Sequence, residues 1–147
     1  MKPRLIPLTV APEAIQAMLN LENYVRSSGL EKSLMELVKI RASQLNQCAF
    51  CIHMHTKDAR SEGETEERIY LLSAWRESPL YTDRERAALA WTESLTLIAA
   101  THAPDEDYAL LQKHFSSDEQ IKLSLLIGTI NIWNRLAIGF KMVHPTK

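Results

Sequence analysis

The spacing of helix-breaking residues is the feature that most limits what this chain can fold into. Its four glycines and six prolines fall mostly between segments whose apolar residues recur every three or four positions. No segment has the run of alternating β-branched residues that is typical of a half-buried strand. The pattern therefore predicts an all-α protein with about six to seven helices.

Caps and breaks place these helices along the chain. Residues up to about Val10 are expected to be extended, because Pro3 and Pro7 oppose a helix there. The predicted helices cover about residues 12–27, 33–45, 48–61, 64–76, 82–100, 104–114 and 117–140. Three pairs have capping spacing, namely Ser33 with Glu36, Thr82 with Glu85, and Ser117 with Gln120. Apolar stripes are expected to include Ile98 and, aligned on the last helix, Ile121, Leu125, Gly128 and Ile132.

Length and charge narrow the class of protein. The 147 residues, 46% of them apolar, suffice for a single domain over residues 1–147. The 17 basic and 18 acidic side chains are nearly balanced, so no nucleic-acid partner is expected. No apolar stretch reaches the roughly 20 residues needed to span a bilayer, and the first ten residues do not resemble a signal peptide. The sequence therefore predicts a cytoplasmic protein that does not bind membranes.

The two cysteines, Cys48 and Cys51, carry the strongest chemical signal. In a reducing compartment a structural disulfide is not expected, which favours a catalytic, redox-sensing or metal-binding pair. On a helix that begins near Cys48, Cys51 lies about 60° from Cys48 and about 40° from His55, so the three share one face. The helix N-terminus lowers a thiol pKa. His55, one turn past Cys51, favours the second cysteine as the nucleophile.

A carboxylate could complete this group. Glu36 could orient His55 as the third member of a triad, provided that a turn near Asn46 and Gln47 folds the two helices together. His53 is predicted to point elsewhere. Other interpretations stay open: Glu36 as a capping residue, the cysteines as packed core residues, and a zinc site formed by the cysteines, His55 and either Glu36 or His53.

The composite spacing resembles a known motif. Glu36, eleven intervening residues, Cys48-x-x-Cys51, three residues and His55 resemble the core of alkyl hydroperoxidase D-like (AhpD-like) proteins of the carboxymuconolactone decarboxylase superfamily. The stretches 81–91 and 132–137 are similar to later helices of that family, so the resemblance covers about residues 10–140.

The resemblance implies a fold and an activity. It implies an all-helical homo-oligomer (dimer, trimer or hexamer) that reduces hydroperoxides at the expense of an external dithiol, either a small protein or a lipoyl-type group. Cys51 would be the peroxidatic thiol, His55 and Glu36 would relay its proton, and Cys48 would resolve the sulfenate as an internal disulfide. No metal and no other cofactor is implied.

Phe50 departs from the family pattern. The best-studied sites of this type have a histidine at that position, so weaker peroxidase activity or a different substrate is expected here. Alternative functions are a redox sensor or thiol–disulfide binding module with little turnover, a scaffold with packed cysteines, and a carboxymuconolactone decarboxylase-type enzyme. Family members with decarboxylase activity generally lack the cysteine pair.

Overall fold

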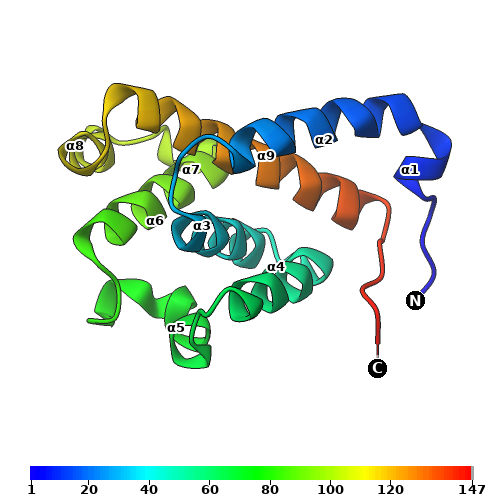
Figure 1. Ribbon diagram of the computed structural model, residues 1–147, viewed down its shortest axis with the longest axis horizontal. Helices are drawn as coiled ribbons and strands as arrows, with labels where there is room; N and C mark the ends of the chain where they lie inside the picture. Colours follow the sequence, from blue (N-terminus) through cyan, green and yellow to red (C-terminus); the bar gives the residue numbers. More distant parts are fainter. Residues whose placement is uncertain (147) are drawn as a thin grey trace.

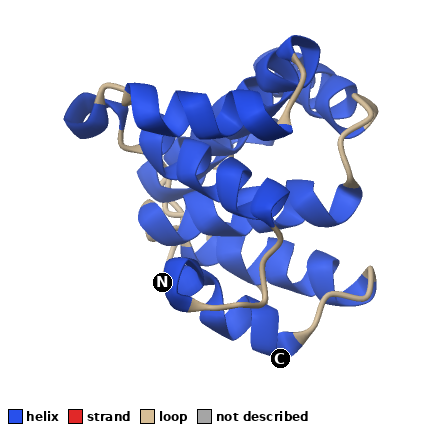
Figure 2. Cartoon of the chain, turned by 90° about the vertical axis from the view of Figure 1, so that its left-hand side faces the viewer, coloured by secondary structure: helices blue, strands red, loops and turns tan. Residues whose placement is uncertain are grey.

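The computed structural model describes residues 1–146, and over these residues it contains helices and loops only (Figure 2). The all-α prediction is confirmed. None of the described helices is both long enough and apolar enough to cross a bilayer. The α-helices are α1 (Pro7–Val10), α2 (Pro12–Arg26), α3 (Lys32–Leu45), α4 (Ala49–Ser61), α5 (Glu66–Leu71), α6 (Asp83–Thr96), α7 (Ile98–Thr101), α8 (Asp105–His114) and α9 (Ser117–Gly139), with a 3₁₀ helix at Leu72–Glu77.

Helix α3 is the centre of the arrangement. It packs against α4, α6 and α9, while α2 lies along α9 on the upper side of the molecule (Figure 1). One apolar cluster joins α2, α3, α6, α8 and α9, and a second joins α3 to α4, the 3₁₀ helix and α6. Because nine residues of α3 are buried, the helix has no fully solvated face over most of its length. Charged residues on α3 are thus forced to find partners inside the protein.

The helix number differs from the prediction because two single-turn helices were missed. Residues 7–10 form α1 rather than an extended segment: Pro7 is a favourable first helical residue, and Arg4 anchors the segment by donating its backbone N–H to the carbonyl of Phe140. The predicted helix 82–100 ends at Thr96, and α7 follows after Leu97. Ile98 is exposed, so its predicted burial is wrong.

One of the three predicted caps is confirmed. Thr82 and Glu85 form a complete capping box. The last helix is capped one residue earlier than predicted, by Ser116 with Glu119. The predicted cap at Ser33 is wrong, because α3 begins one residue earlier, at Lys32, and Glu36 is buried and engaged by other partners.

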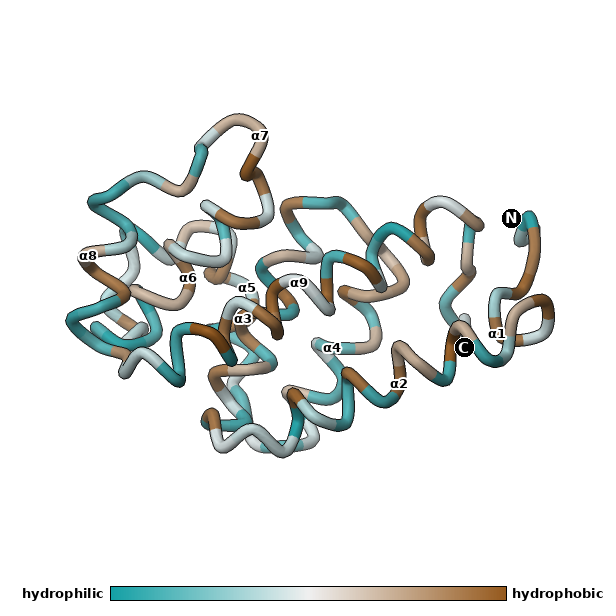
Figure 3. The backbone as a smooth tube through the Cα atoms, turned by 90° about the horizontal axis from the view of Figure 1, so that it is seen from above, coloured by the Kyte–Doolittle hydropathy of each residue, from teal (hydrophilic) through white to brown (hydrophobic). Residues whose placement is uncertain are grey.

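The aligned stripe on α9 faces solvent instead of the core. Ile121, Leu125 and Ile132 are exposed, whereas Leu126 and Ile130 are buried. Apolar residues occur along much of α9 (Figure 3), so periodicity alone could not decide which face is inward. Both chain ends lie at the end of the molecule that α1 occupies (Figure 1).

Candidate redox site

The two cysteines stand at the beginning of α4, as the sequence predicted. Cys48 is the N-cap residue of α4 and Cys51 lies in its first turn. The two are joined by a disulfide, with their Cα atoms 5.4 Å apart. Both are almost fully buried, with 1% and 2% of their surface exposed, and they pack with Phe50, Ala137 and Met142. The structure therefore represents the oxidised form of the pair.

A tight turn brings α4 back onto α3. Gln47 has a φ of 57°, in the left-handed region, and the backbone N–H of Cys48 donates to the carbonyl of Ser43 at 2.9 Å. The side-chain amide of Asn46 donates to the Oδ1 atoms of Asn131 and Asn134 on α9, at 3.0 and 2.9 Å. These bonds attach the turn to α3 and to α9, and they thereby set the position of Cys48.

The turn places Glu36 beside His55. Oε2 of Glu36 lies 3.1 Å from Nδ1 of His55, and both side chains are buried. Burial alone would raise the pKa of Glu36, but the hydrogen bond with His55 and the charge of Lys39 outweigh it and hold that pKa below its ordinary value. In a neutral imidazole whose Nδ1 donates its proton to an ionised Glu36, Nε2 is free to accept a proton.

Two further charged residues, not predicted as part of the site, extend this pair. The ammonium of Lys39 lies 3.2 Å from Oε1 of Glu36 and 3.3 Å from Oε1 of Glu22 on α2. Glu22 also accepts from the indole Nε1 of Trp133, at 3.3 Å, and pairs with Arg26. The sequence carried a signal for Glu22, which follows Met18 by four positions and so lies on the apolar face of its helix.

An apolar cavity of about 430 Å³ opens beside Cys51. Cys51 and His55 both line it, whereas Cys48 and Glu36 do not. Its walls come from α1, α2, α4 and α9 and from the residues before α1 and after α9. Because the cavity reaches only one sulfur of the disulfide, a small molecule inside it would meet Cys51. The apolar lining residues include Leu8, Ile15, Leu19, Phe50, Met54 and Leu136.

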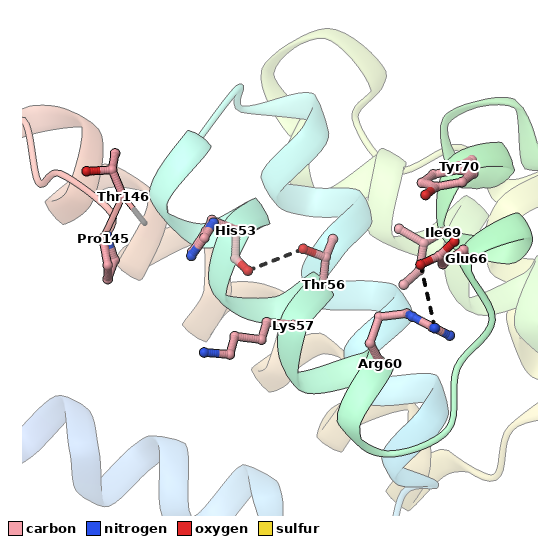
Figure 4. A pocket seen from close by; sticks show the side chains of 9 residues that line it. All are labelled: His53, Thr56, Lys57, Arg60, Glu66, Ile69, Tyr70, Pro145 and Thr146. Carbon is pink, nitrogen blue, oxygen red and sulfur yellow. Dashed lines mark hydrogen bonds and ion pairs between the residues drawn. The ribbon is translucent and has the colours of Figure 1, made fainter.

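His53 lies outside this group. It is exposed, its ring stacks on that of His144 with centroids 4.6 Å apart, and it lines a separate surface pocket of about 570 Å³ (Figure 4). In Figure 4 the basic residues Lys57 and Arg60 lie further along the same helix, and Arg60 pairs with Glu66. The prediction that His53 points away from the cysteines is confirmed. His53 therefore does not take the place of the histidine that the family resemblance implies at position 50, where this chain has Phe50.

One set of donors among the described residues has metal-like spacing. Ligand atoms of Glu36, His55 and Asp58 lie within 4.8 Å of one another. A cation there would sit beside the ammonium of Lys39 and would replace the bond between Glu36 and His55. The cysteines are not part of this set, since they are bonded to each other. The arrangement suits proton transfer better than metal binding.

Comparison with known proteins places the chain in a family. The model of the carboxymuconolactone decarboxylase family matches residues 12–94, which include the whole of the Glu36–His55 segment. The chain belongs to this family. The AhpD-like motif, from Glu36 to His55, lies inside the matched region, so the match also supports the resemblance to AhpD-like members of the family.

Two relatives of known sequence match most of the chain. This chain is 46% identical over 130 residues to the uncharacterized protein YdfG of Bacillus subtilis, and the match covers 88% of both proteins. It is 30% identical over 110 residues to the uncharacterized protein YnjA of Escherichia coli, covering 73% of this chain and 58% of YnjA.

Solved structures agree with the family assignment. A crystal structure of a protein of unknown function from Agrobacterium tumefaciens, described as a candidate antioxidant defence protein AhpD, has a TM-score of 0.97 and 49% identity, covering 99% of this chain and all of that one. The debrominase Bmp8 has a TM-score of 0.84 at 18% identity, covering 92% of this chain and 73% of that one. The Bmp8 likeness shows the fold alone.

Proposed function

We propose that this protein is an oxidoreductase that reduces organic hydroperoxides with its own thiols. The observation that carries the proposal is that Cys51, in a disulfide with Cys48, lines an apolar cavity together with His55, whose other ring nitrogen is bound by Glu36. A candidate nucleophile and a candidate base, four residues apart on α4, thus line one cavity, and a carboxylate contacts the base. Family membership supports a peroxidase-like role at the coarser level.

The first half of the cycle starts from the reduced cysteines. Nε2 of His55 takes the proton of Cys51, and the thiolate formed is favoured by the positive end of α4. The thiolate sulfur attacks the terminal oxygen of the hydroperoxide, and the O–O bond breaks. The alkoxide leaves with the proton returned by His55 as an alcohol, and Cys51 becomes a sulfenic acid.

The second half restores the thiols. The sulfur of Cys48 attacks that of Cys51, a water molecule leaves, and the disulfide forms. An external dithiol then attacks the disulfide, forms a mixed disulfide, and leaves as its own oxidised form with both cysteines reduced. Because the cavity reaches Cys51 and not Cys48, a slender dithiol such as a lipoyl-type group fits this step better than a broad protein surface.

The cavity bears on the choice of peroxide. Phe50, Met54 and Leu19 offer apolar surface beside the sulfur, and each methylene group that a substrate buries there contributes about 0.8 kcal/mol. Hydrogen peroxide has no such group. We therefore expect hydroperoxides with an apolar body to be reduced with a higher kcat/KM than hydrogen peroxide.

Self-association is part of the proposal. The exposed stripe of Ile121, Leu125 and Ile132 on α9 is an apolar surface that a second copy of the chain could cover. The number of subunits is a matter for measurement by light scattering.

The test is peroxide consumption by the purified protein with dihydrolipoamide as the reductant. Wild type should reduce cumene hydroperoxide faster than hydrogen peroxide; Cys51→Ser should have no turnover, and Cys48→Ser should stop after one. His53→Ala, on the exposed side of α4, is the matched control and should match wild type. If wild type consumes no peroxide while both thiols stay titratable, the protein is not a peroxidase, and a redox-sensing role gains weight.

A further inference from the structure

Glu36 and His55, which contact each other, line two different cavities of contrasting character. His55 lines the apolar cavity at Cys51, whereas Glu36 lines a second pocket of about 550 Å³ that contains polar and charged side chains. Glu36 and Lys39 reach this second pocket, and His55 does not. A proton taken from Cys51 on the apolar side could thus be balanced from the polar side.

Lys39 is an unusual residue for this position. Only 2% of its surface is exposed, and its ammonium contacts two carboxylates, on Glu36 of its own helix and Glu22 of α2. Lysine is almost never so deeply buried unless it is paired. A buried lysine beside the proposed proton acceptor therefore requires an explanation that the motif itself does not give.

The surroundings of Glu36 hold charges of both signs. The charged residues of α2 in these surroundings are Glu22 and Arg26. None of the described residues of α6 or α9 lines the polar pocket. The closest are Lys39 and His55, each within 3.2 Å of a carboxylate oxygen of Glu36. The other charged groups that line the pocket are Lys32 of α3, Asp58 of α4 and Glu62, which follows α4.

Resting on the proposed function, we propose that Lys39 is a positioning residue which keeps Glu36 ionised, so that His55 presents an unprotonated Nε2 to Cys51. Glu22 holds Lys39 in place and shares its charge. If Lys39 were neutral, the pair would take up a proton at a higher pH, because a buried carboxylate without a cation favours its protonated form. A proton on His55 would occupy Nε2, so this nitrogen could no longer accept from the thiol, and a proton on Glu36 would remove the negative charge that stabilises a protonated His55.

The test measures thiol ionisation and needs no peroxide. In a reduced Cys48→Ser background, the rate of alkylation of Cys51 by iodoacetamide is followed from pH 5 to pH 10. The rate is expected to rise with pH, and this rising limb of the rate–pH profile should shift to higher pH by about one unit in Lys39→Met. Alkylation at pH 7 then becomes about tenfold slower, while the rate at pH 10 is unchanged. Lys39→Arg, which restores the cation, should stay within about twofold of the background.

A second substitution tests the sign of the effect. Glu22→Gln keeps the acceptor for Trp133 but removes one negative charge, so the limb should move to lower pH, opposite to Lys39→Met. This variant decides the question if Lys39→Met does not fold, as judged by circular dichroism. Lys57→Met, an exposed lysine of α4, is the matched control and should leave the limb in place.

The outcomes separate this inference from the proposed function. A limb that moves in opposite directions for Lys39→Met and Glu22→Gln supports the role of Lys39, even if the wild type shows no peroxidase turnover. An unmoved limb, or one that moves in the same direction in both variants, overturns that role even if the enzyme reduces peroxides. A rate that falls equally at every pH assigns Lys39 to packing alone and also overturns the inference.

Discussion

Two charged clusters of the protein use similar residues for different purposes. In one, Arg68 of α5 donates to Glu64 at 2.8 Å and to Glu85 at 2.7 Å, and so joins α5 to the first turn of α6. In the other, Lys39 joins Glu36 to Glu22.

The clusters differ in what else they contact. Arg68 also lies over the ring of Tyr81, and its neighbouring carboxylates raise its pKa further above an already high value, so it stays charged at every pH the protein meets. The cluster of Lys39 ends on an imidazole that lines a cavity. An imidazole can both accept and release a proton, so its presence lets an ion-pair cluster take part in proton transfer.

The largest effect should come from breaking the second cluster at its carboxylate. Glu36→Gln keeps the shape of the side chain but cannot stabilise a protonated His55, so kcat/KM at pH 7 should fall about a hundredfold. Steady-state kinetics with cumene hydroperoxide measure this. Glu85→Gln, the equivalent change in the first cluster, should leave kcat/KM unchanged. A loss of less than about threefold in Glu36→Gln would contradict the relay.

Breaking the first cluster should affect stability alone. Arg68→Met leaves Glu64 and Glu85 without their shared cation, and since the pair is only partly shielded from water, the free energy of unfolding should fall by about 2 kcal/mol. Urea unfolding followed by circular dichroism gives the value. Alkylation of Cys51 in this variant should keep the wild-type pH dependence; a shifted profile would mean that the clusters are coupled.

The contribution of Glu36 to stability should depend on pH. The pKa of Glu36 is lower in the folded protein than in the unfolded chain, so its contribution to stability is present above the ordinary glutamate pKa and is lost as the pH falls through the lower, folded value. Glu36→Gln should therefore lose less stability than wild type when the pH is lowered from 7 to 4. Urea unfolding at both pH values is the measurement, and an equal loss in the two proteins would show that Glu36 contributes nothing to the acid response.

The smallest effect is expected at Phe50. Phe50→His places a second imidazole near the sulfur and makes its surroundings more polar, which should speed alkylation of Cys51 at pH 7 about threefold. The same variant should also narrow the preference for cumene hydroperoxide over hydrogen peroxide, since apolar surface is lost. A slower alkylation would indicate that the apolar ring itself supports the reactive thiol.

The sequence predicted the parts of the site that depend on local geometry. Helical spacing relates Cys51 to His55, and the break at Asn46 and Gln47 was visible from residue type. Lys39 and Glu22 were not assigned to the site in this way, because the contact between them joins two different helices, which spacing along a single helix does not reveal. The inward face of α9 was undetermined for a related reason: a helix that is apolar on most sides does not reveal which side another helix covers.

The walls of the apolar cavity come partly from the two ends of the chain and partly from α2 and α4. Ile6, Pro7 and Leu8 contribute at one end, and Trp133 to Met142 at the other, all outside the segment 12–94 that the family model matches. The reacting cysteines and the histidine lie inside it. The stretch that carries the reacting residues also supplies Leu19, Phe50 and Met54 to the cavity wall, and the two ends of the chain complete that wall. Terminal segments tolerate change well, so relatives with the same reactive core can reshape one part of the cavity by altering their ends.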